Sequence, residues 1–501
     1  MNIPFLTILV FFPLLGALLL LLLPRLNIRT LYTLAGAWAL LELIGTAFLL
    51  NLGDSVTAGY NATDSFNWVP SLGLNYRLGV DNISAWLVIL TAFLTLVTII
   101  GAGFIAPIVE RPNVFLAWIF ALEMGIIGVF LATNLLLFYV FWEVMIIPAY
   151  FLIGQWGGPN RVRAAVRFVL YTFAGSLLML VSILALVFLT TPVGGVPSLD
   201  FESVRKAIMG LPAGTQDWLF LGFAAGFVVK VPLIPFQTWL PDAYCESPAP
   251  VTVMLAGAMS KTGAYGFLRF GVFLFPNAAH DFAPWLAGLA LVNIIYGALA
   301  ALAQTDLRRL LAYSSLSHMG FIILGIFAMN SQGVSGAVLQ MVNHGIVTPA
   351  LFLALAALAR RVPAENLNEI GGLQKVMPRL AALFLVLGLA SLGLPGLNQF
   401  AGEFLILGGS FLASPIYAVA AVVGLVLAAW YMLRFFQAVW HGPNKQSIAT
   451  QNIKVMDMQR AEFALFVPLV LLIVLLGVAP IIVTGPLSNT VTAWLAPVII
   501  R

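Results

Sequence analysis

Six ionisable side chains lie inside long apolar runs, where a lipid bilayer makes charge costly. They are Glu143, Lys230, Lys261, His318, His344 and Glu403. A charge near the bilayer centre costs at least ~3 kcal/mol on insertion scales, and such residues commonly line ion or proton paths. Carboxyl, amino and imidazole groups can each take up and release a proton. We therefore expect these six residues to form a proton relay.

Glu143 and Lys230 are an acid and a base in separate apolar runs, and we expect them to pair. Burial disfavours the charged form of both groups, whereas pairing favours it. A pair poised in this way can be switched by a nearby charge, and breaking it lowers the proton affinity of the lysine. The alternative is a static buried ion pair.

Lys261, His318 and His344 precede Glu403 in sequence order and supply the middle of the predicted relay. Small residues around Lys261 allow close helix packing or leave room for water. Imidazoles titrate nearest neutrality. A lone buried histidine is equally often a packing residue, but two on adjacent predicted helices favour proton transfer. Metal binding is disfavoured, because no ligand pair has the right spacing and no cysteine lies nearby.

Two further glutamates lie within apolar runs. Glu123 is in the run before that of Glu143, so we expect it to communicate with Glu143 as an additional proton-transfer residue. Glu42 lies in an early run, and a structural or interface role is expected there. No cofactor-binding pattern, phosphate loop or nucleophilic triad is recognisable.

The composition requires these residues to sit in a membrane protein. The chain has 501 residues, of which 61% are hydrophobic and only 8% charged. Soluble domains are far more polar, so we predict one continuous transmembrane domain over residues 1–501. The net charge of +4 comes from scattered basic residues and does not imply nucleic acid. The single cysteine, Cys245, excludes an internal disulfide and a thiolate metal cluster.

Apolar runs long enough to cross ~30 Å of hydrocarbon predict an all-α polytopic membrane protein with about fourteen helices. The expected spans are 3–24, 30–52, 79–103, 113–132, 134–154, 165–190, 218–240, 249–274, 284–305, 308–330, 333–360, 379–408, 413–440 and 462–485. The tail 487–501 is apolar but too short to cross, so we expect it on the surface or against a neighbour.

The distribution of basic residues predicts the orientation. Fifteen lie in one set of alternate loops and four in the other. Lys and Arg concentrate on the cytoplasmic side, so both termini are expected on the opposite side. The larger set is Arg25, Arg29, Arg111, Arg161, Arg163, Arg167, Arg308, Arg309, Arg360, Arg361, Lys375, Arg379, Lys445, Lys454 and Arg460. The smaller set is Arg77, Arg205, Lys206 and Arg501.

Prolines are expected to break helices seven and twelve. The first break follows Lys230 at Pro232 and Pro235, and the second precedes Glu403 at Pro395. Broken helices at corresponding positions are typical of transporters built from inverted repeats. We therefore predict two inverted five-helix repeats, over 113–274 and 284–440. The alternative is that proline is simply frequent in membrane helices.

Around these residues the chain resembles the antiporter-like membrane subunits of respiratory complex I and the related NDH-1 complexes. It is most similar to the subunit 4 type, called the M chain in bacteria and the D chain in NDH-1. That type carries glutamate on helix twelve, where other antiporter-like chains carry lysine. The motifs are Trp142-Glu143, Lys230-Val-Pro-Leu-Ile-Pro-Phe-Gln-Thr-Trp-Leu-Pro-Asp242, Lys261-Thr-Gly-Ala-Tyr-Gly, Ser317-His318-Met-Gly, Asn343-His344-Gly and Gly402-Glu403-Phe.

The resemblance implies a proton-translocating subunit of a quinone-reducing NAD(P)H or ferredoxin dehydrogenase. It makes Glu143 and Lys230 the switchable pair, Lys261 and the histidines the centre, and Glu403 the terminal site. The sequence departs from the family at Tyr244-Cys245-Glu246, where family members often have His-x-Glu. This departure bears on local proton uptake.

The resemblance also implies that this chain binds no cofactor, because quinone (plastoquinone in NDH-1) and electron donor belong to other subunits. Its expected partners are other membrane subunits, including further antiporter-like chains, and the lipid bilayer. The expected location is a bacterial inner membrane or a cyanobacterial thylakoid, with both termini periplasmic or lumenal. The alternatives are a cation/proton antiporter subunit of the Mrp type, an NDH-1 variant linked to CO2 uptake, and an inert scaffold.

Overall fold

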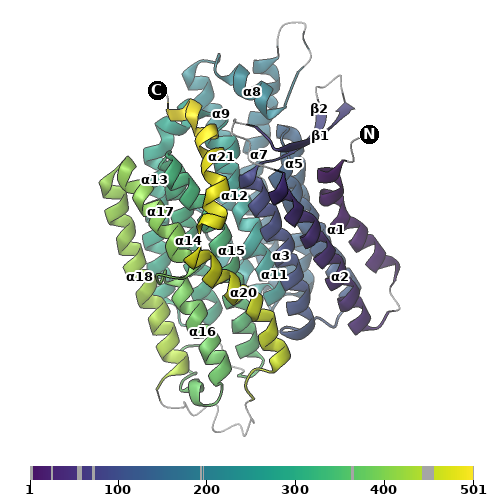
Figure 1. The fold of residues 1–501 in the computed structure, drawn as a ribbon, viewed down its shortest axis with the longest axis vertical. Coiled ribbons are helices and arrows are strands. Elements are labelled where there is room, and N and C mark those ends of the chain that lie inside the picture. Colours follow the sequence, from purple (N-terminus) through teal and green to yellow (C-terminus); the bar gives the residue numbers. More distant parts are fainter. Residues whose placement is uncertain are drawn as a thin grey trace.

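The apolar runs form helices that pack side by side along the longest axis of the molecule (Figure 1). The computed structural model describes residues 4–23, 26–52, 59–69, 74–191, 195, 197–362, 366–442 and 456–499. Four of the basic residues used to predict the orientation, Arg25, Lys445, Lys454 and Arg501, lie outside the described residues. The first half of the chain contains α1 (Phe5–Leu22), α2 (Ile28–Ala47), α3 (Asn82–Phe104), α4 (Pro112–Leu131), α5 (Leu135–Val144), α6 (Ile146–Trp156), α7 (Arg161–Thr190), α8 (Phe201–Ile208) and α9 (Ala213–Lys230).

The second half surrounds the centre of the bundle. It contains α10 (Trp239–Glu246), α11 (Ala249–Met254), α12 (Ser260–Gly266), α13 (Pro276–Ala303), α14 (Leu307–Phe327), α15 (Ser331–Ala359), α16 (Pro378–Ser391), α17 (Asn398–Ala413), α18 (Pro415–Trp440), α20 (Arg460–Val478) and α21 (Ile481–Ile499). Helices α14 and α15 are almost wholly buried, whereas α7, α18 and α20 expose much of their surface. The centre of the bundle is therefore built around α15.

The predicted fourteen-helix membrane fold is confirmed in its essentials. Eleven helices among the described residues are long and apolar enough to cross a membrane, with α5 and α6 counted as one. The other three expected spans are α9, the interrupted helix over 249–272 and the pair α16 and α17. The inverted repeats over 113–274 and 284–440 stay a prediction.

Both predicted helix breaks are present. Helix α9 ends at Lys230, and the chain becomes helical again only at Trp239. Helix α16 ends at Ser391, and α17 begins at Asn398. Between them Gly393 and Gly396 have φ values of +75° and +91°, which side chains disfavour and glycine tolerates. The breaks thus leave backbone groups without regular helical partners close to Lys230 and Glu403.

The C-terminal segment differs from the prediction. We expected a last span to residue 485 and a tail on the surface or against a neighbour, but α20 ends at Val478 and a second helix, α21, follows Pro480. Helix α21 packs against α15 and α3 and buries Val483, Leu487 and Trp494. The tail is therefore part of the core, because its own apolar face has a partner inside the chain.

A two-stranded antiparallel hairpin adds to the all-helical prediction. Strands β1 (Ala62–Val69) and β2 (Leu74–Val80) pair with Phe66 opposite Tyr76. The carboxyl of Asp64 accepts hydrogen bonds from the backbone and hydroxyl of Thr7, at 2.7 and 2.9 Å. The first turn of a helix has unpaired N–H groups, so the hairpin caps α1.

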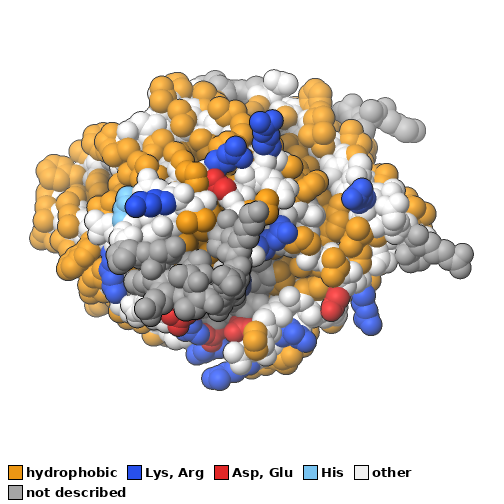
Figure 2. Space-filling model, turned by 90° about the horizontal axis from the view of Figure 1, so that it is seen from below, with side chains coloured by type: hydrophobic (Ala, Val, Ile, Leu, Met, Phe, Trp, Pro, Cys, Tyr) orange, Lys and Arg blue, Asp and Glu red, His pale blue; other side chains and the backbone are white. Residues whose placement is uncertain are grey.

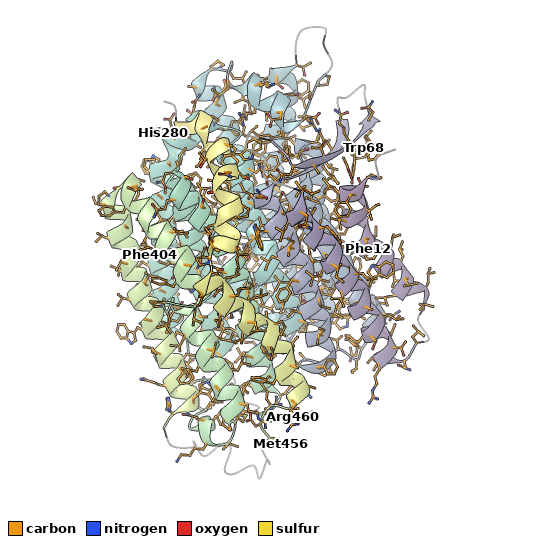
Figure 3. The ribbon with its side chains drawn as sticks, in the orientation of Figure 1. Phe12, Trp68, His280, Phe404, Met456 and Arg460 are labelled. Atoms are coloured by element: carbon orange, nitrogen blue, oxygen red, sulfur yellow. The ribbon has the colours of Figure 1, made fainter. Side chains whose placement is uncertain are left out.

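The two ends of the molecule differ. Both termini lie at one end, as an even number of crossings requires (Figure 1). Figure 3 shows Trp68 and His280 toward that end and Met456 and Arg460 at the opposite end. Figure 2 looks at this opposite end and shows Lys and Arg side chains spread among apolar ones. Which end faces the cytoplasm remains a prediction.

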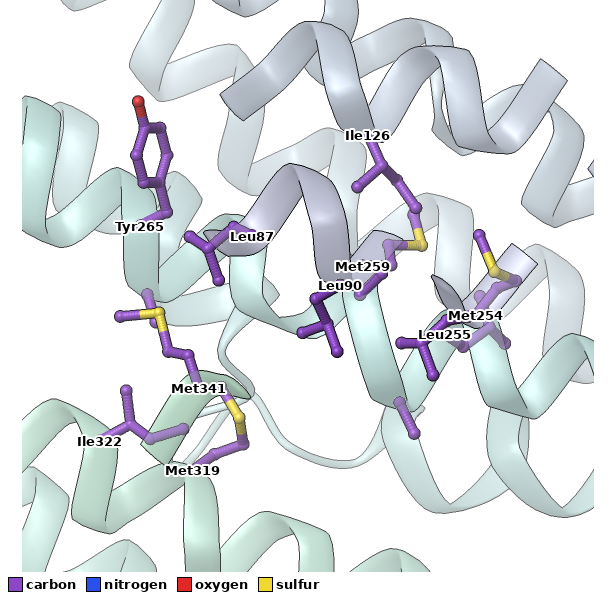
Figure 4. Packing of buried hydrophobic residues seen from close by; sticks show 14 of the residues in the cluster. Leu87, Leu90, Ile126, Met254, Leu255, Met259, Tyr265, Met319, Ile322 and Met341 are labelled. Carbon is purple, nitrogen blue, oxygen red and sulfur yellow. The ribbon is translucent and has the colours of Figure 1, made fainter. Parts of the chain in front are cut away.

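Flexible apolar side chains fill the middle of the bundle. Met254, Met259, Met319 and Met341 lie among leucines and isoleucines from α3, α4 and α14 (Figure 4). Methionine adapts its shape to irregular gaps. The regions of the bundle between the ionisable residues are therefore closely packed.

Candidate functional site

Lys261 lies on an irregular helix. Residues 249–272 are continuously helical, but two π-helical segments, η3 (Leu255–Met259) and η4 (Phe267–Val272), flank α12. Such π segments occur frequently at functional sites. The Lys261 Nζ lies 2.5 Å from the Ala256 carbonyl, 3.2 Å from Ser260 Oγ and 2.7 Å from His344 Nδ1. An ammonium group has three donors, so these acceptors satisfy a charged Lys261.

His344, on α15, receives one of these hydrogen bonds. When Lys261 is charged, His344 Nδ1 must act as the acceptor, which places the ring proton on Nε2. That Nε2 has no hydrogen-bond partner among the described residues. The ring centroid of His344 lies 5.8 Å from that of His318 on α14. The two predicted histidines are therefore neighbours inside the bundle.

His318 links the histidine pair to Glu403 on α17. His318 Nδ1 lies 2.9 Å from Glu403 Oε1, and both side chains are buried. Gly393, in the break before α17, makes room for this carboxyl, because a Cβ there would lie 2.8 Å from Glu403 Oε2. On the same helix Phe404 points outward (Figure 3). Lys261, His344, His318 and Glu403 thus form one buried series across four helices.

Glu143 and Lys230 lie close together but not in contact. Lys230 is 1% exposed, and its Nζ has no hydrogen-bond partner among the described residues. It lies 5.5 Å and 5.4 Å from the ring centroids of Trp142 and Phe168. Glu143 is half-buried and near enough for its charge to act on Lys230. The expected pair is therefore separated, with the cation resting on aromatic faces.

Close helix packing brings Lys230 toward the series. The position of Gly263, on α12, would place a Cβ 3.1 Å from the Cβ of Lys230. Glycine is needed for this approach, and it sets Lys230 beside the helix that carries Lys261. Glu123 is buried on α4, and neither carboxyl oxygen has a hydrogen-bond partner among the described residues. Its expected communication with Glu143 stays a prediction.

The structure adds polar residues that the sequence analysis missed. Gln340 Nε2 donates to Glu403 Oε1 and to Gln399 Oε1, each at 3.1 Å. The hydroxyl of Tyr431 lies 3.5 Å from His318 Nε2 and 2.7 Å from Ser314 Oγ. A sequence signal existed for the two glutamines, because Gln340 precedes His344, and Gln399 precedes Glu403, by four residues. That spacing places both members on one helix face.

The short helix α10 forms a charged cluster at one end of the bundle. Asp242 accepts hydrogen bonds from Arg167 at 2.6 Å and from Arg309 at 3.3 Å. These bonds join α7, α10 and α14 next to the departure at Tyr244-Cys245-Glu246. Burial raises the pKa of the Cys245 thiol, so it stays protonated and unreactive. Among the described residues, no three His, Cys, Asp or Glu side chains gather as a metal site.

Comparisons with known proteins agree with this arrangement. A sequence model of the family described as NADH:quinone oxidoreductase/Mrp antiporter, transmembrane, matches residues 132–428. Subunit M of NADH-quinone oxidoreductase from Rickettsia bellii (strain RML369-C) is 38% identical over 488 residues, covering 96% of both chains. Subunit M from Escherichia coli (strain K12) is 38% identical over 463 residues, covering 88% of this chain and 89% of its own.

Solved structures share the whole fold. A chain of respiratory complex I from Thermus thermophilus with bound NADH matches with a TM-score of 0.87 and 32% identity, covering 98% of this chain and 99% of that chain. The Mrp complex from Dietzia sp. DQ12-45-1b matches with a TM-score of 0.84 at 21% identity, covering 99% and 98%, which shows the fold alone. The family match and the full-length relatives together identify this chain as a member of the NADH:quinone oxidoreductase/Mrp antiporter transmembrane family.

Proposed function

We propose that this chain is the M-type membrane subunit of an NADH-quinone oxidoreductase and translocates protons. The observation that carries this is the buried series of Lys261, His344, His318 and Glu403. Its two contacts of 2.7 and 2.9 Å are joined by the imidazole rings of the histidines, whose centroids are 5.8 Å apart. Each member can donate and accept a proton. Subunit M relatives of nearly full length support the same assignment.

Protons pass along this series by side-chain transfer. Lys261 gives a proton to His344 Nδ1, and His344 releases one from Nε2 toward His318. The ring centroids are 5.8 Å apart, so this step needs a bridging water or a ring rotation. His318 then protonates Glu403 through the 2.9 Å contact. Glu403 ends the series at the helix break, where it exchanges protons with the outside or a neighbouring subunit.

Glu143 and Lys230 act as the switch. Because Lys230 lacks a hydrogen-bond partner among the described residues, its charged form depends on the nearby carboxylate of Glu143. Movement of Glu143 away from Lys230 lowers the proton affinity of the lysine and pushes a proton toward Lys261. The separation seen here is one position of that switch.

The rest of the complex supplies the redox chemistry. Quinone and the electron donor, NAD(P)H or ferredoxin, bind to other subunits, and further membrane subunits flank this chain. The basic end faces the cytoplasm, and both termini face the periplasm or the thylakoid lumen. The Mrp-type alternative rests on a shared fold at 21% identity, whereas the subunit M relatives are 38% identical.

The test uses the assembled complex with Lys230→Met or Glu143→Gln. Both replacements keep the side-chain size and remove the titrating group. We expect each to abolish most proton pumping while the complex still assembles. The matched control is Lys206→Met, because Lys206 is exposed on α8. Normal pumping in assembled Lys230→Met complexes would contradict the proposal. Sodium flux without an electron donor would favour the Mrp-type function.

A further inference from the structure

Two acidic side chains are buried on packed helices inside the bundle, away from the series described above. Glu42 on α2 is 1% exposed, and Glu123 on α4 is 0% exposed. The two helices pack together, and the carboxyl groups are close enough for a charge on one to act on the other. Glu42 Oε1 and both carboxyl oxygens of Glu123 have no hydrogen-bond partner among the described residues.

Helix α3 contributes hydroxyl groups to this region. The hydroxyl of Thr95 approaches Glu123 and lies 3.1 Å from the Thr91 carbonyl and 3.7 Å from the sulfur of Met254. A threonine hydroxyl has one proton and two lone pairs, so it can contact a carboxyl group in either protonation state. Thr98, one turn further along α3, is buried, and its hydroxyl has no partner among the described residues.

Basic side chains do not neutralise the two carboxyl groups. Among the described residues, no Lys, Arg or His lies within 4.0 Å of Glu42 or Glu123 as an ion pair. Lys261 gives its donors to Ala256, Ser260 and His344. The titratable groups on these helices and on the elements packed against them are Arg29, Tyr32, Tyr76, Arg77, Tyr139, Glu143, Tyr150, Lys261 and Tyr265.

Burial of two unpaired carboxylates is prohibitive. An isolated ionised carboxylate loses most of its solvation in an apolar medium, so such groups take up a proton instead. Two neighbouring carboxyls cannot both be ionised, because each disfavours the charge of the other. At least one of Glu42 and Glu123 therefore needs a bound positive species, and their burial without a basic partner favours a proton.

We propose that Glu42 and Glu123 form a dicarboxyl site that binds and holds a proton inside the bundle. The site uses α2, α3 and α4, whereas Glu403 lies on α17 at the opposite side of the molecule (Figure 1). It is therefore a second proton-binding site, separate from the series from Lys261 to Glu403. It does not depend on whether that series pumps protons.

The experiment is infrared spectroscopy of the purified complex in H2O and D2O at neutral pH. A protonated carboxyl has a C=O stretching band that a carboxylate lacks, and deuterium exchange shifts it. We expect the difference spectrum of wild type minus Glu123→Gln to contain such a band, and that of wild type minus Glu42→Gln to contain the same band or a shifted one. Glu110→Gln is the matched control, because Glu110 is exposed just before α4. Its replacement should leave the band of the protonated carboxyl unchanged.

Two results would overturn the proposal. The first is an unchanged carboxyl band in folded Glu123→Gln and Glu42→Gln proteins. The second needs no variant: loss of the band when sodium chloride replaces choline chloride around wild-type protein would show a cation site instead. A persistent band in Lys230→Met protein that no longer pumps would support this site independently of the relay.

Discussion

The imidazole of His318 and the carboxyl of Glu403 lie 2.9 Å apart, although 85 residues separate them in the chain. The contact depends on the break in the twelfth span. Gly393 leaves the space that the carboxyl occupies, and Gln340 donates to the same oxygen at 3.1 Å. A disrupted helix thus places a titratable carboxyl at the end of a buried series of proton-carrying groups.

Replacement of Glu403 tests whether this carboxyl must titrate. Glutamine preserves the shape but cannot take up a proton, so pumping should fall by about a hundredfold, at the low end of general acid–base effects. Glu403→Lys should preserve pumping in part, because it keeps a titrating group and Gln340 Oε1, which has no hydrogen-bond partner in the described part of the chain, can accept from it. Pumping relative to electron transfer is the measurement. Full pumping in the glutamine variant would make Glu403 a structural residue.

Substitution of Lys261 tests whether this residue carries protons or only supplies a fixed charge. Lys261→Arg keeps a cation beside His344, but guanidinium does not release its proton in proteins. We expect both Lys261→Arg and Lys261→Met to lose most pumping in reconstituted vesicles. Lys375→Met is the matched control, because Lys375 is exposed. If the arginine variant pumps normally, Lys261 acts only through its charge.

The orientation of the chain is testable with single cysteines. Arg163 lies at the start of α7 and Lys206 on α8, and both are exposed. Helix α7 has 30 residues and is about 45 Å long at 1.5 Å per residue. We expect Arg163→Cys to label from the cytoplasmic side and Lys206→Cys from the other. Cys245→Ser removes the native thiol from the background. Labelling of both positions from one side would contradict the fourteen-helix topology.

Trp494 should contribute strongly to stability. It is 1% exposed, its Nε1 donates to Asp81 at 3.1 Å, and its ring lies 4.9 Å from the guanidinium of Arg269. Arg269 also pairs with Asp81 at 2.5 Å. We expect Trp494→Ala to cost about 3–5 kcal/mol, as for buried aromatic residues generally.

Thermal unfolding in detergent measures the effect of Trp494→Ala. The control is Trp218→Ala, because Trp218 is 77% exposed and surface substitutions usually change stability by less than about 0.5 kcal/mol. Equal midpoints for the two variants would mean that the helix α21 contributes little to the fold.

The sequence alone determined the class of protein, the approximate spans, the two helix breaks and the residues of the series. These depend on local properties. A bilayer of fixed thickness requires apolar runs of a certain length, and proline disrupts the helix in which it occurs. Charged groups in such runs are rare enough to mark function before any contact is known.

Only the tertiary structure decided which groups meet. The contact of Lys261 with His344 and the separation of Glu143 from Lys230 depend on how far each helix rotates and how closely it packs. The buried C-terminal helix escaped prediction for the same reason: its partners on α3 and α15 lie far away in sequence. Long-range packing, which no local pattern encodes, sets these contacts.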